Sequence, residues 1–204
     1  MYTPKAFAMD SIGACHALMR TCPFAIPVSH DGESLAATHI PFLLEADGPD
    51  DRGRLLGHMA RANPQWQACA GTGEEVLVVF PGPHAYVSPT WYEEPARNVP
   101  TWNYVTVHAQ GPLRPLDPDA VRRMLGTLSA GYEGEAGWRM DMLSDQQAEG
   151  LSRAIMAFEI PITRLEGKQK LSQNKAPADR RNVARGLREA GEARLAALVG
   201  PTIA

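Results

Sequence analysis

The segment 57–66, Gly-His-Met-Ala-Arg-Ala-Asn-Pro-Gln-Trp, combines residue types that suit a phosphate group. A predicted strand over 54–60 would deliver His58 and Arg61 to a turn, and the next helix is expected to begin at Asn63-Pro64. A helix N-terminus offers unpaired N–H groups, and a guanidinium adds a fork of donors. The pattern therefore predicts an anion site, with an exposed arginine beside an ordinary helix cap as the alternative.

Aromatic side chains with polar tips gather in a second segment, 82–104, which holds two of the four tryptophans and three of the five tyrosines. The tripeptide Pro-Thr-Trp occurs twice there, at 89–91 and at 100–102. Aromatic residues in proline-stiffened turns suit a flat ring ligand or an interface. A hydrophobic cover over one end of a barrel would explain the same composition.

A third segment, 168–175, is polar and carries three lysines. It follows a predicted strand and is expected to close over a phosphate or a neighbouring subunit, or to be a solvated loop. Other chemistries lack their signatures, because the chain has no GxxxxGK[ST], GxGxxG, HExxH or nucleophile-elbow motif, and its six histidines lack metal-ligand spacing. The sequence therefore predicts no metal site and names no catalytic residue.

The elements that must position these segments follow from hydrophobic periodicity and turn signals. Helices are expected over 10–21, 64–70, 117–130, 144–154 and 178–199, and strands over 24–29, 34–44, 54–60, 76–80, 83–88, 101–113 and 155–164. Trp102, Tyr104, Thr106, His108 and Gln110 share one face of the strand over 101–113. Because strands dominate the first 115 residues, we expect a mainly β, α+β fold: a Greek-key barrel with flanking helices.

The composition fits one domain over 1–204, with a basic C-terminal helix at about 177–199. Hydrophobic residues make up 44% of the 204 residues, the net charge is −3, and no apolar run approaches the roughly 18 residues of a membrane span. The three cysteines, Cys15, Cys22 and Cys69, form no CxxC pair and no secretory signal is present, so we expect reduced thiols and a cytoplasmic protein. Membrane, disulfide-stapled and disordered classes are excluded.

The charge is unevenly placed along the chain. Residues 163–204 hold nine Lys and Arg against four Asp and Glu, whereas residues 1–162 hold eleven against nineteen. The basic tail could meet an anion, a nucleic acid or the acidic body of a partner subunit, and the plain alternative is a solvated helix on its own domain.

Four stretches together resemble the PaiB family of FMN-binding negative transcriptional regulators. They are His-Met-Ala-Arg-Ala-Asn-Pro-Gln-Trp at 58–66, Gly-Pro-His-Ala-Tyr-Val-Ser-Pro-Thr-Trp-Tyr at 82–92, Val-Pro-Thr-Trp-Asn-Tyr at 99–104 and Lys-Leu-Ser-Gln-Asn at 170–174. The opening Met-Tyr-Thr-Pro and Ala-Thr-His-Ile-Pro at 37–41 also fit, so the resemblance runs from Met1 to about Asn174.

The resemblance implies a split β-barrel similar to pyridoxamine-phosphate oxidases, and a homodimer with two FMN sites at its interface. The cofactor-binding residues that it implies are Thr38, His39, His58, Met59, Arg61 and Asn63, with Trp102, Tyr104 and Gln110 from the other subunit, and Lys170, Ser172 and Gln173 reaching the phosphate or sealing the dimer. Arg61 is the expected phosphate ligand. One departure from split-barrel oxidases is that the two strands offer only this one strong cation.

Three functions remain open on the sequence alone. The resemblance favours a negative transcriptional regulator that acts on DNA directly or indirectly, although no helix-turn-helix is evident. The alternative is an FMN-dependent oxidoreductase or reductase, in which the flavin carries the redox chemistry. A dimeric binding module for another planar ligand is the third.

Overall fold

The computed structural model describes residues 1–47, 51–70, 73–134 and 136–200, and it divides into two compact units. Unit 1 comprises Met1–Leu18, Pro81–Val107 and the C-terminal segment from Glu166. Unit 2 comprises Met19–Phe80 and His108–Leu165. Three strands, β7, β8 and β11, contribute to both units. The expectation of one domain over 1–204 stays a prediction.

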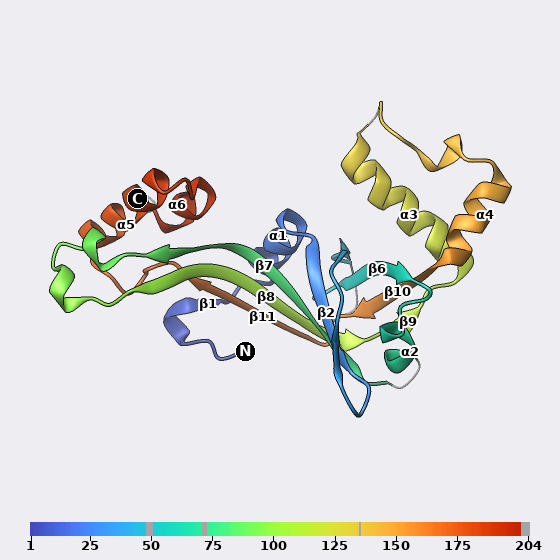
Figure 1. Ribbon diagram of the computed structural model, residues 1–204, viewed down its shortest axis with the longest axis horizontal. Coiled ribbons are helices and arrows are strands. Elements are labelled where there is room, and N and C mark those ends of the chain that lie inside the picture. Colours follow the sequence, from blue (N-terminus) through green and yellow to red (C-terminus); the bar gives the residue numbers. More distant parts are fainter. Residues whose placement is uncertain (48–50, 71–72, 135, 201–204) are drawn as a thin grey trace. The chain divides into compact units, whose positions relative to one another are not determined.

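Unit 1 is a sheet covered on one face by helices (Figure 1). Its strands lie in the order β1-β11-β8-β7. The elements are η1 Lys5–Phe7, β1 Ala8–Met9, α1 Ile12–Thr21, β7 Glu75–Val87, η2 Pro89–Trp91, η3 Pro95–Arg97, β8 Thr101–Pro112, β11 Arg164–Lys170, α5 Pro177–Glu189 and α6 Ala193–Val199, of which β7, β8, α1 and β11 belong only in part to this unit.

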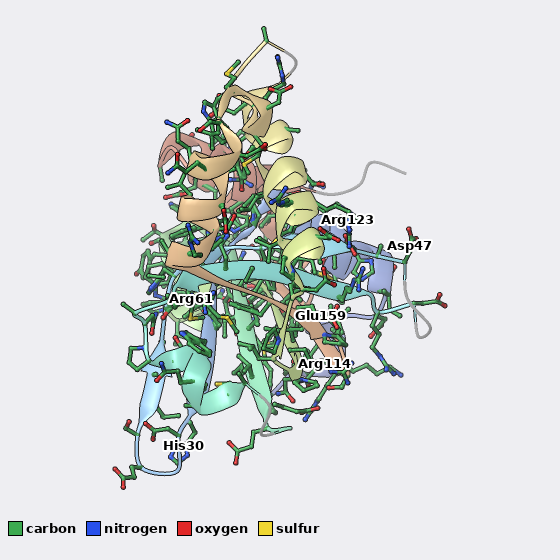
Figure 2. All side chains as sticks on the ribbon, turned by 90° about the vertical axis from the view of Figure 1, so that its right-hand side faces the viewer. His30, Asp47, Arg61, Arg114, Arg123 and Glu159 are labelled. Carbon is green, nitrogen blue, oxygen red and sulfur yellow. The ribbon has the colours of Figure 1, made fainter. Side chains whose placement is uncertain are left out.

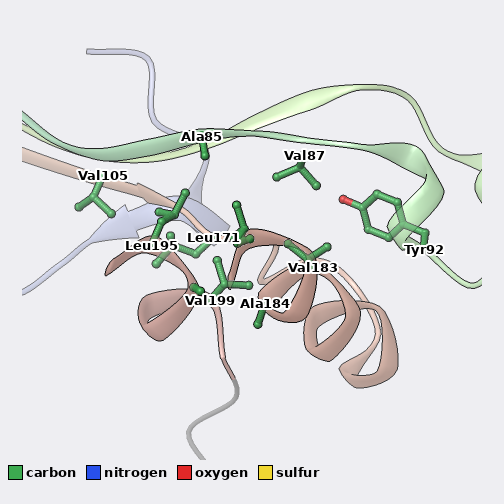
Figure 3. Close-up of a cluster of buried hydrophobic side chains, with 11 residues drawn as sticks. Ala85, Val87, Tyr92, Val105, Leu171, Val183, Ala184, Leu195 and Val199 are labelled. Carbon is green, nitrogen blue, oxygen red and sulfur yellow. The ribbon is translucent and has the colours of Figure 1, made fainter. Parts of the chain in front are cut away.

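The core of unit 1 lies between the sheet and the helices α5 and α6 (Figure 3). Val87 and Val105 of the strands pack there against Val183, Leu187 and other buried side chains of the two helices. The face of α5 comes so close to η2 that a Cβ on Gly186 would overlap the ring of Trp91. Glycine at position 186 therefore allows the helix to approach the indole.

Unit 2 contains a four-stranded antiparallel sheet in the order β5-β6-β10-β9, and β2 pairs with β3, β4 and β7. Its elements are β2 Phe24–His30, β3 Leu35–Ala37, β4 Ile40–Pro41, β5 Leu43–Glu45, β6 Arg54–Ala60, α2 Gln65–Cys69, β9 Arg114–Pro115, α3 Pro118–Glu133, η4 Met140–Met142, α4 Asp145–Ala154 and β10 Ile155–Pro161. Met124 of α3 packs on Leu56 of β6 and Ala157 of β10. The helix α3 thus covers one face of the β5-β6-β10-β9 sheet (Figure 1).

Two helices in unit 2 begin close to the positions expected from the sequence, and both have capped N-termini. Asp117 caps α3 by accepting a hydrogen bond from the Ala120 N–H at 2.8 Å. Ser144 and Gln147 form a reciprocal capping box at the start of α4. Both bounds agree with the predicted helices to within a few residues.

The structure corrects four of the sequence expectations. The strands expected over 76–80 and 83–88 are one strand, β7. Gly82 allows the strand to continue, because a Cβ there would lie 2.6 Å from the Val105 carbonyl oxygen of the neighbouring strand. The two flanking prolines are less buried than Gly82. The stretch 34–44 forms three short strands around Pro41. The helix expected over 178–199 is two helices, because Gly191 takes a left-handed φ of 85° between them. Part of the polar run 168–175 belongs to β11.

No helix in the described ranges is long and apolar enough to cross a membrane.

Substituting Gly111 with alanine is expected to destabilise the protein strongly. Gly111 is buried in β8, and a Cβ there would overlap the backbone carbonyl oxygen of Pro161, which cannot move without shifting β10. We expect the free energy of unfolding to fall by about 3 kcal/mol or more in a urea denaturation. Gly126→Ala in α3, where nothing lies near the added Cβ, is the control and should be neutral or slightly stabilising. Equal stability of the two variants would contradict this packing.

Candidate functional site

Arg61 lies in the turn that follows β6, next to the start of β10. Glu159 of β10 and Arg114, its neighbour on β9, lie toward the other end of the sheet (Figure 2). Its Nε donates a hydrogen bond to the Arg153 carbonyl oxygen at 2.8 Å, and its backbone N–H donates to the Ala154 carbonyl oxygen at 2.9 Å. The Trp66 indole Nε1 donates to the Arg61 carbonyl oxygen at 2.9 Å. These bonds fix the turn against the end of α4.

A pocket of about 330 Å³ opens beside Arg61, between this turn and the helices α3 and α4. Arg122 from α3 and Arg153 from α4 line it together with Arg61, so three arginines line one cavity. Glu149 is the one carboxylate in the lining, and it pairs with Arg153 at 3.1 Å. The pocket therefore keeps an excess of positive charge, which suits a phosphate group.

The wall of the same pocket is apolar, formed by Leu116, Pro118 and Val121. A cationic group of donors next to an apolar wall fits an organic phosphate, whose charged and uncharged parts need different surroundings. Arg122 and Arg153 are not among the residues expected from the sequence, because both lie on helices that are expected only to flank the barrel. No local pattern around them indicates that they meet Arg61.

His58 lies on the same face of β6 as Leu56, two residues earlier, which packs under α3. Its side chain is half-buried, and among the residues that the structure describes Nδ1 has no hydrogen-bond partner, although it is shielded from solvent. Burial lowers the pKa of the His58 imidazole, which favours the neutral form near pH 7. A buried ring nitrogen without a partner is an observation that fits a ligand hydrogen bond at this position.

Thr38 and Asn63 form a hydrogen-bonded group with the buried side chain of Gln65. Thr38 Oγ1 donates to Gln65 Oε1 at 2.5 Å and accepts from Asn63 Nδ2 at 2.9 Å. Gln65 Nε2 in turn donates to the carbonyl oxygens of Pro27 and Ala36, at 3.0 and 3.2 Å. The group ties α2 to the neighbouring strands, so it positions the turn at Arg61.

The helix that was expected to supply an anion-binding N-terminus is short. It has five residues, Gln65–Cys69, and the Gln65 N–H already donates to Asn63 Oδ1 at 3.0 Å. Its contribution to an anion site is therefore small. Three expected residues of unit 2 remain. Met59 is buried, and His39 is exposed beside Phe24. Gln110 lies on the less buried face of β8.

Aromatic side chains line one face of the sheet in unit 1. Trp102 is 54% exposed, and its ring centroid lies 6.3 Å from those of both Tyr86 and His84. The Lys168 ammonium lies 5.2 Å from the centre of the Tyr104 ring and 5.7 Å from that of Tyr2. An open cavity of about 390 Å³ lies over Trp102 and Tyr104.

Lys170, Ser172 and Gln173 also lie in unit 1. Lys170 Nζ donates to Thr101 Oγ1 and to the Trp102 carbonyl oxygen. Ser172 is buried and bonds Asn103, and the Gln173 side chain accepts from the Leu171 N–H at 2.7 Å. The twelve expected residues thus divide between the two units. That both groups serve one cofactor site stays a prediction.

Comparison with known proteins identifies the class of protein that this fold represents. Residues 1–164 match the model of a family described as "Putative FMN-binding domain". The chain belongs to this family, and its cofactor is FMN, as predicted. The matched residues end before Lys170.

The chain is also similar to individual proteins over most of its length. It is 35% identical over 190 residues to "Protease synthase and sporulation protein PAI 2" of Bacillus subtilis, which is PaiB, covering 90% of this chain and 87% of the relative. It is also 31% identical over 230 residues to the uncharacterized protein AN0679 of Emericella nidulans, covering 94% of this chain and 92% of the relative. The expected resemblance to PaiB is confirmed.

Solved structures confirm the predicted fold class. The FAD- and heme-binding protein from Mycobacterium smegmatis matches with a TM-score of 0.62 and 20% identity, covering 84% of this chain and 78% of the other. The flavocytochrome Anf3 from Azotobacter vinelandii matches with a TM-score of 0.61 and 14% identity, covering 80% and 69%. The chain is a mainly antiparallel split β-barrel with flanking helices.

Proposed function

We propose that this FMN-binding protein is a cytoplasmic negative transcriptional regulator that holds its flavin at a homodimer interface. The observation that carries the proposal is the similarity to PAI 2 over 90% of the chain, because the name of that relative links it to protease synthesis and sporulation. Three further features of the structure support parts of the proposal: a cationic pocket, an exposed aromatic face and a row of arginines.

The pocket at Arg61 is the proposed site of the FMN phosphate. Arg61, Arg122 and Arg153 of the pocket lining supply guanidinium donors. His58 does not line the pocket but lies on β6, the strand that leads to Arg61, and within the described residues its buried Nδ1 has no partner, so we assign it a hydrogen bond to another part of the cofactor. Thr38 and Asn63 hold the turn in place through Gln65, while Met59 lies on β6 and His39 lies between β3 and β4. FMN supplies a redox-active ring when bound, and the side chains named here bind and orient it.

The aromatic face of unit 1 is the proposed surface for the second subunit. Tyr86 is 45% exposed and Trp102 54% exposed, and they form one contiguous group with His84. Exposed aromatic groups of this kind are typical of interfaces. Tyr104 and Gln110 share the strand face of Trp102, so in this arrangement they would face the partner.

A row of arginines on α5 is the proposed contact with DNA. Arg181, Arg185 and Arg188 are all exposed and follow one another at intervals of four and three residues, which places them on one helix face. At about 1.5 Å of rise per residue the row spans roughly 10 Å, so more than one phosphate of a DNA strand lies within its reach. This row belongs to the basic C-terminal segment of the sequence.

A gel shift with an operator-containing fragment tests the regulator directly. Wild-type protein should bind at low salt, and replacing Arg181, Arg185 and Arg188 by glutamine should weaken binding and reduce the salt slope by about 0.9 for each DNA phosphate that is no longer neutralised. The matched control replaces Arg20, Arg114 and Arg123, which are exposed elsewhere, by glutamine and should change binding little. Retention of FMN without DNA affinity at low salt would reject direct binding and favour the oxidoreductase alternative.

A further inference from the structure

A second cationic pocket lies in unit 1, at the turn that leads from β11 to α5. Its volume is about 240 Å³, and Lys170 and Lys175 line it together with Tyr92, Asn98 and Asn174. The described residues that line it include no Asp or Glu. The proposed phosphate pocket at Arg61 belongs to unit 2, so its lining shares no residue with this one.

The two lysine ammonium groups in this pocket carry uncompensated charge. Lys170 Nζ donates to Thr101 Oγ1 and to the Trp102 carbonyl oxygen, and Lys175 Nζ donates to Asn98 Oδ1 at 2.6 Å and lies 4.9 Å from the centre of the Tyr92 ring. All of these partners are neutral, and within the described residues neither ammonium forms a salt bridge. Each has three donors, so at least one N–H remains on each for a ligand.

Lys170 is also partly withdrawn from water. Burial lowers the pKa of its ammonium, and the nearby Lys168 adds to this effect, whereas Tyr104 opposes it. A cation that is partly desolvated and lacks a counter-ion is stabilised when an anion binds beside it.

The turn between the two lysines holds a strained backbone conformation. Ser172 has a φ of 61°, in the left-handed region that residues other than glycine seldom adopt. It is held there by hydrogen bonds from Asn103 Nδ2 to Ser172 Oγ at 2.9 Å and from the Lys175 N–H to the Ser172 carbonyl oxygen at 3.0 Å. Such strain persists only where the surroundings fix it, and it is frequent at ligand-binding sites.

The size of the pocket restricts what it can hold. Pockets for drug-sized ligands usually measure about 300–1,000 Å³, and this one is smaller, so it suits a compact group. Two ammonium groups in the lining offer N–H donors and positive charge to a compact anion with several oxygens.

We propose that the pocket at Lys170 and Lys175 binds a phosphate group, either free phosphate or the head of a small phosphomonoester, separately from the flavin. The site lies on the turn that connects the sheet of unit 1 to α5. Its occupant would neutralise the two lysines and would fix the start of the segment that carries the arginine row.

The test is a calorimetric titration of the FMN-loaded protein with inorganic phosphate, at constant ionic strength maintained with sodium chloride. We expect saturable binding that Lys175→Gln weakens at least about 10-fold, as loss of a charge-assisted hydrogen bond would predict. Lys5→Gln, an exposed lysine of unit 1, is the matched control and should bind phosphate like the wild type. Circular dichroism checks that both variants are folded.

Two further arms distinguish the sources of the phosphate and separate this site from the flavin site. Tighter binding of glycerol phosphate than of inorganic phosphate would identify a phosphomonoester site, and the reverse order a free-phosphate site. Lys175→Gln should leave the affinity for FMN unchanged. Absence of saturable phosphate binding, equal binding by Lys175→Gln, or a loss of FMN affinity in that variant would each overturn the proposal.

Discussion

Replacing Arg61 with alanine is expected to weaken FMN binding by about 1.5–3 kcal/mol, or roughly 10- to 150-fold. The guanidinium lies in a pocket with two further arginines, and its Nε is held by the Arg153 carbonyl oxygen, which leaves its terminal nitrogens available to a phosphate. Quenching of flavin fluorescence on titration of the apoprotein measures the affinity directly.

Riboflavin provides the chemical control for this prediction, since it lacks the phosphate. Its affinity should be the same in the wild type and in Arg61→Ala, so the discrimination between FMN and riboflavin should collapse in the variant. Arg123→Ala is the control for a change of charge on α3, because Arg123 lines a different pocket of unit 2. Unchanged FMN affinity in Arg61→Ala would place the phosphate elsewhere.

The second large effect is expected for Trp102→Glu, which should convert the proposed dimer to a monomer. The substitution removes a large aromatic ring from the middle of the aromatic face and puts there a carboxylate that a partner would have to strip of its water. Central tryptophans of interfaces commonly contribute about 2 kcal/mol or more, so the dimer dissociation constant should rise by about 30-fold at least. Sedimentation equilibrium over a range of protein concentrations measures this constant.

Trp138→Glu is the matched control for that experiment. Trp138 is 39% exposed and belongs to unit 2, outside the aromatic face. Its replacement should leave the mass in solution unchanged. A wild-type protein that sediments as a monomer at micromolar concentration would disprove the proposed interface, as would a dimer that tolerates Trp102→Glu.

Local sequence patterns predicted many of the helices and strands, because side-chain alternation and helix starts depend on residues close together in the chain. The strand over 54–60 coincides with β6, and the predicted alternation along 101–113 matches the buried positions of β8. The helix expected over 117–130 begins within one residue of the observed start of α3 at Pro118. In contrast, Pro81-Gly82-Pro83 resembles a break in a strand, and only the close approach of Val105 on the neighbouring strand explains why β7 continues through it.

The candidate site was partly predictable for the same reason. Arg61 and His58 stand in one short segment whose residue types indicate an anion site. Arg122 and Arg153 line the pocket from α3 and α4, which are far from Arg61 in the sequence. Nothing in the sequence indicates that these helices lie next to Arg61. The burial of His58 Nδ1 likewise depends on packing across strands, which spacing along one strand does not reveal.

The packing of Trp91 on Gly186 makes the indole a built-in optical probe. Its ring lies against the backbone of α5, whereas Trp102 is the exposed tryptophan of the same unit and Trp66 and Trp138 belong to unit 2. In a protein whose other three tryptophans are replaced by phenylalanine, emission would therefore follow the docking of the C-terminal helices alone. Ligand binding at the β11–α5 turn and detachment of the arginine-bearing helix could then be observed separately from unfolding of unit 2.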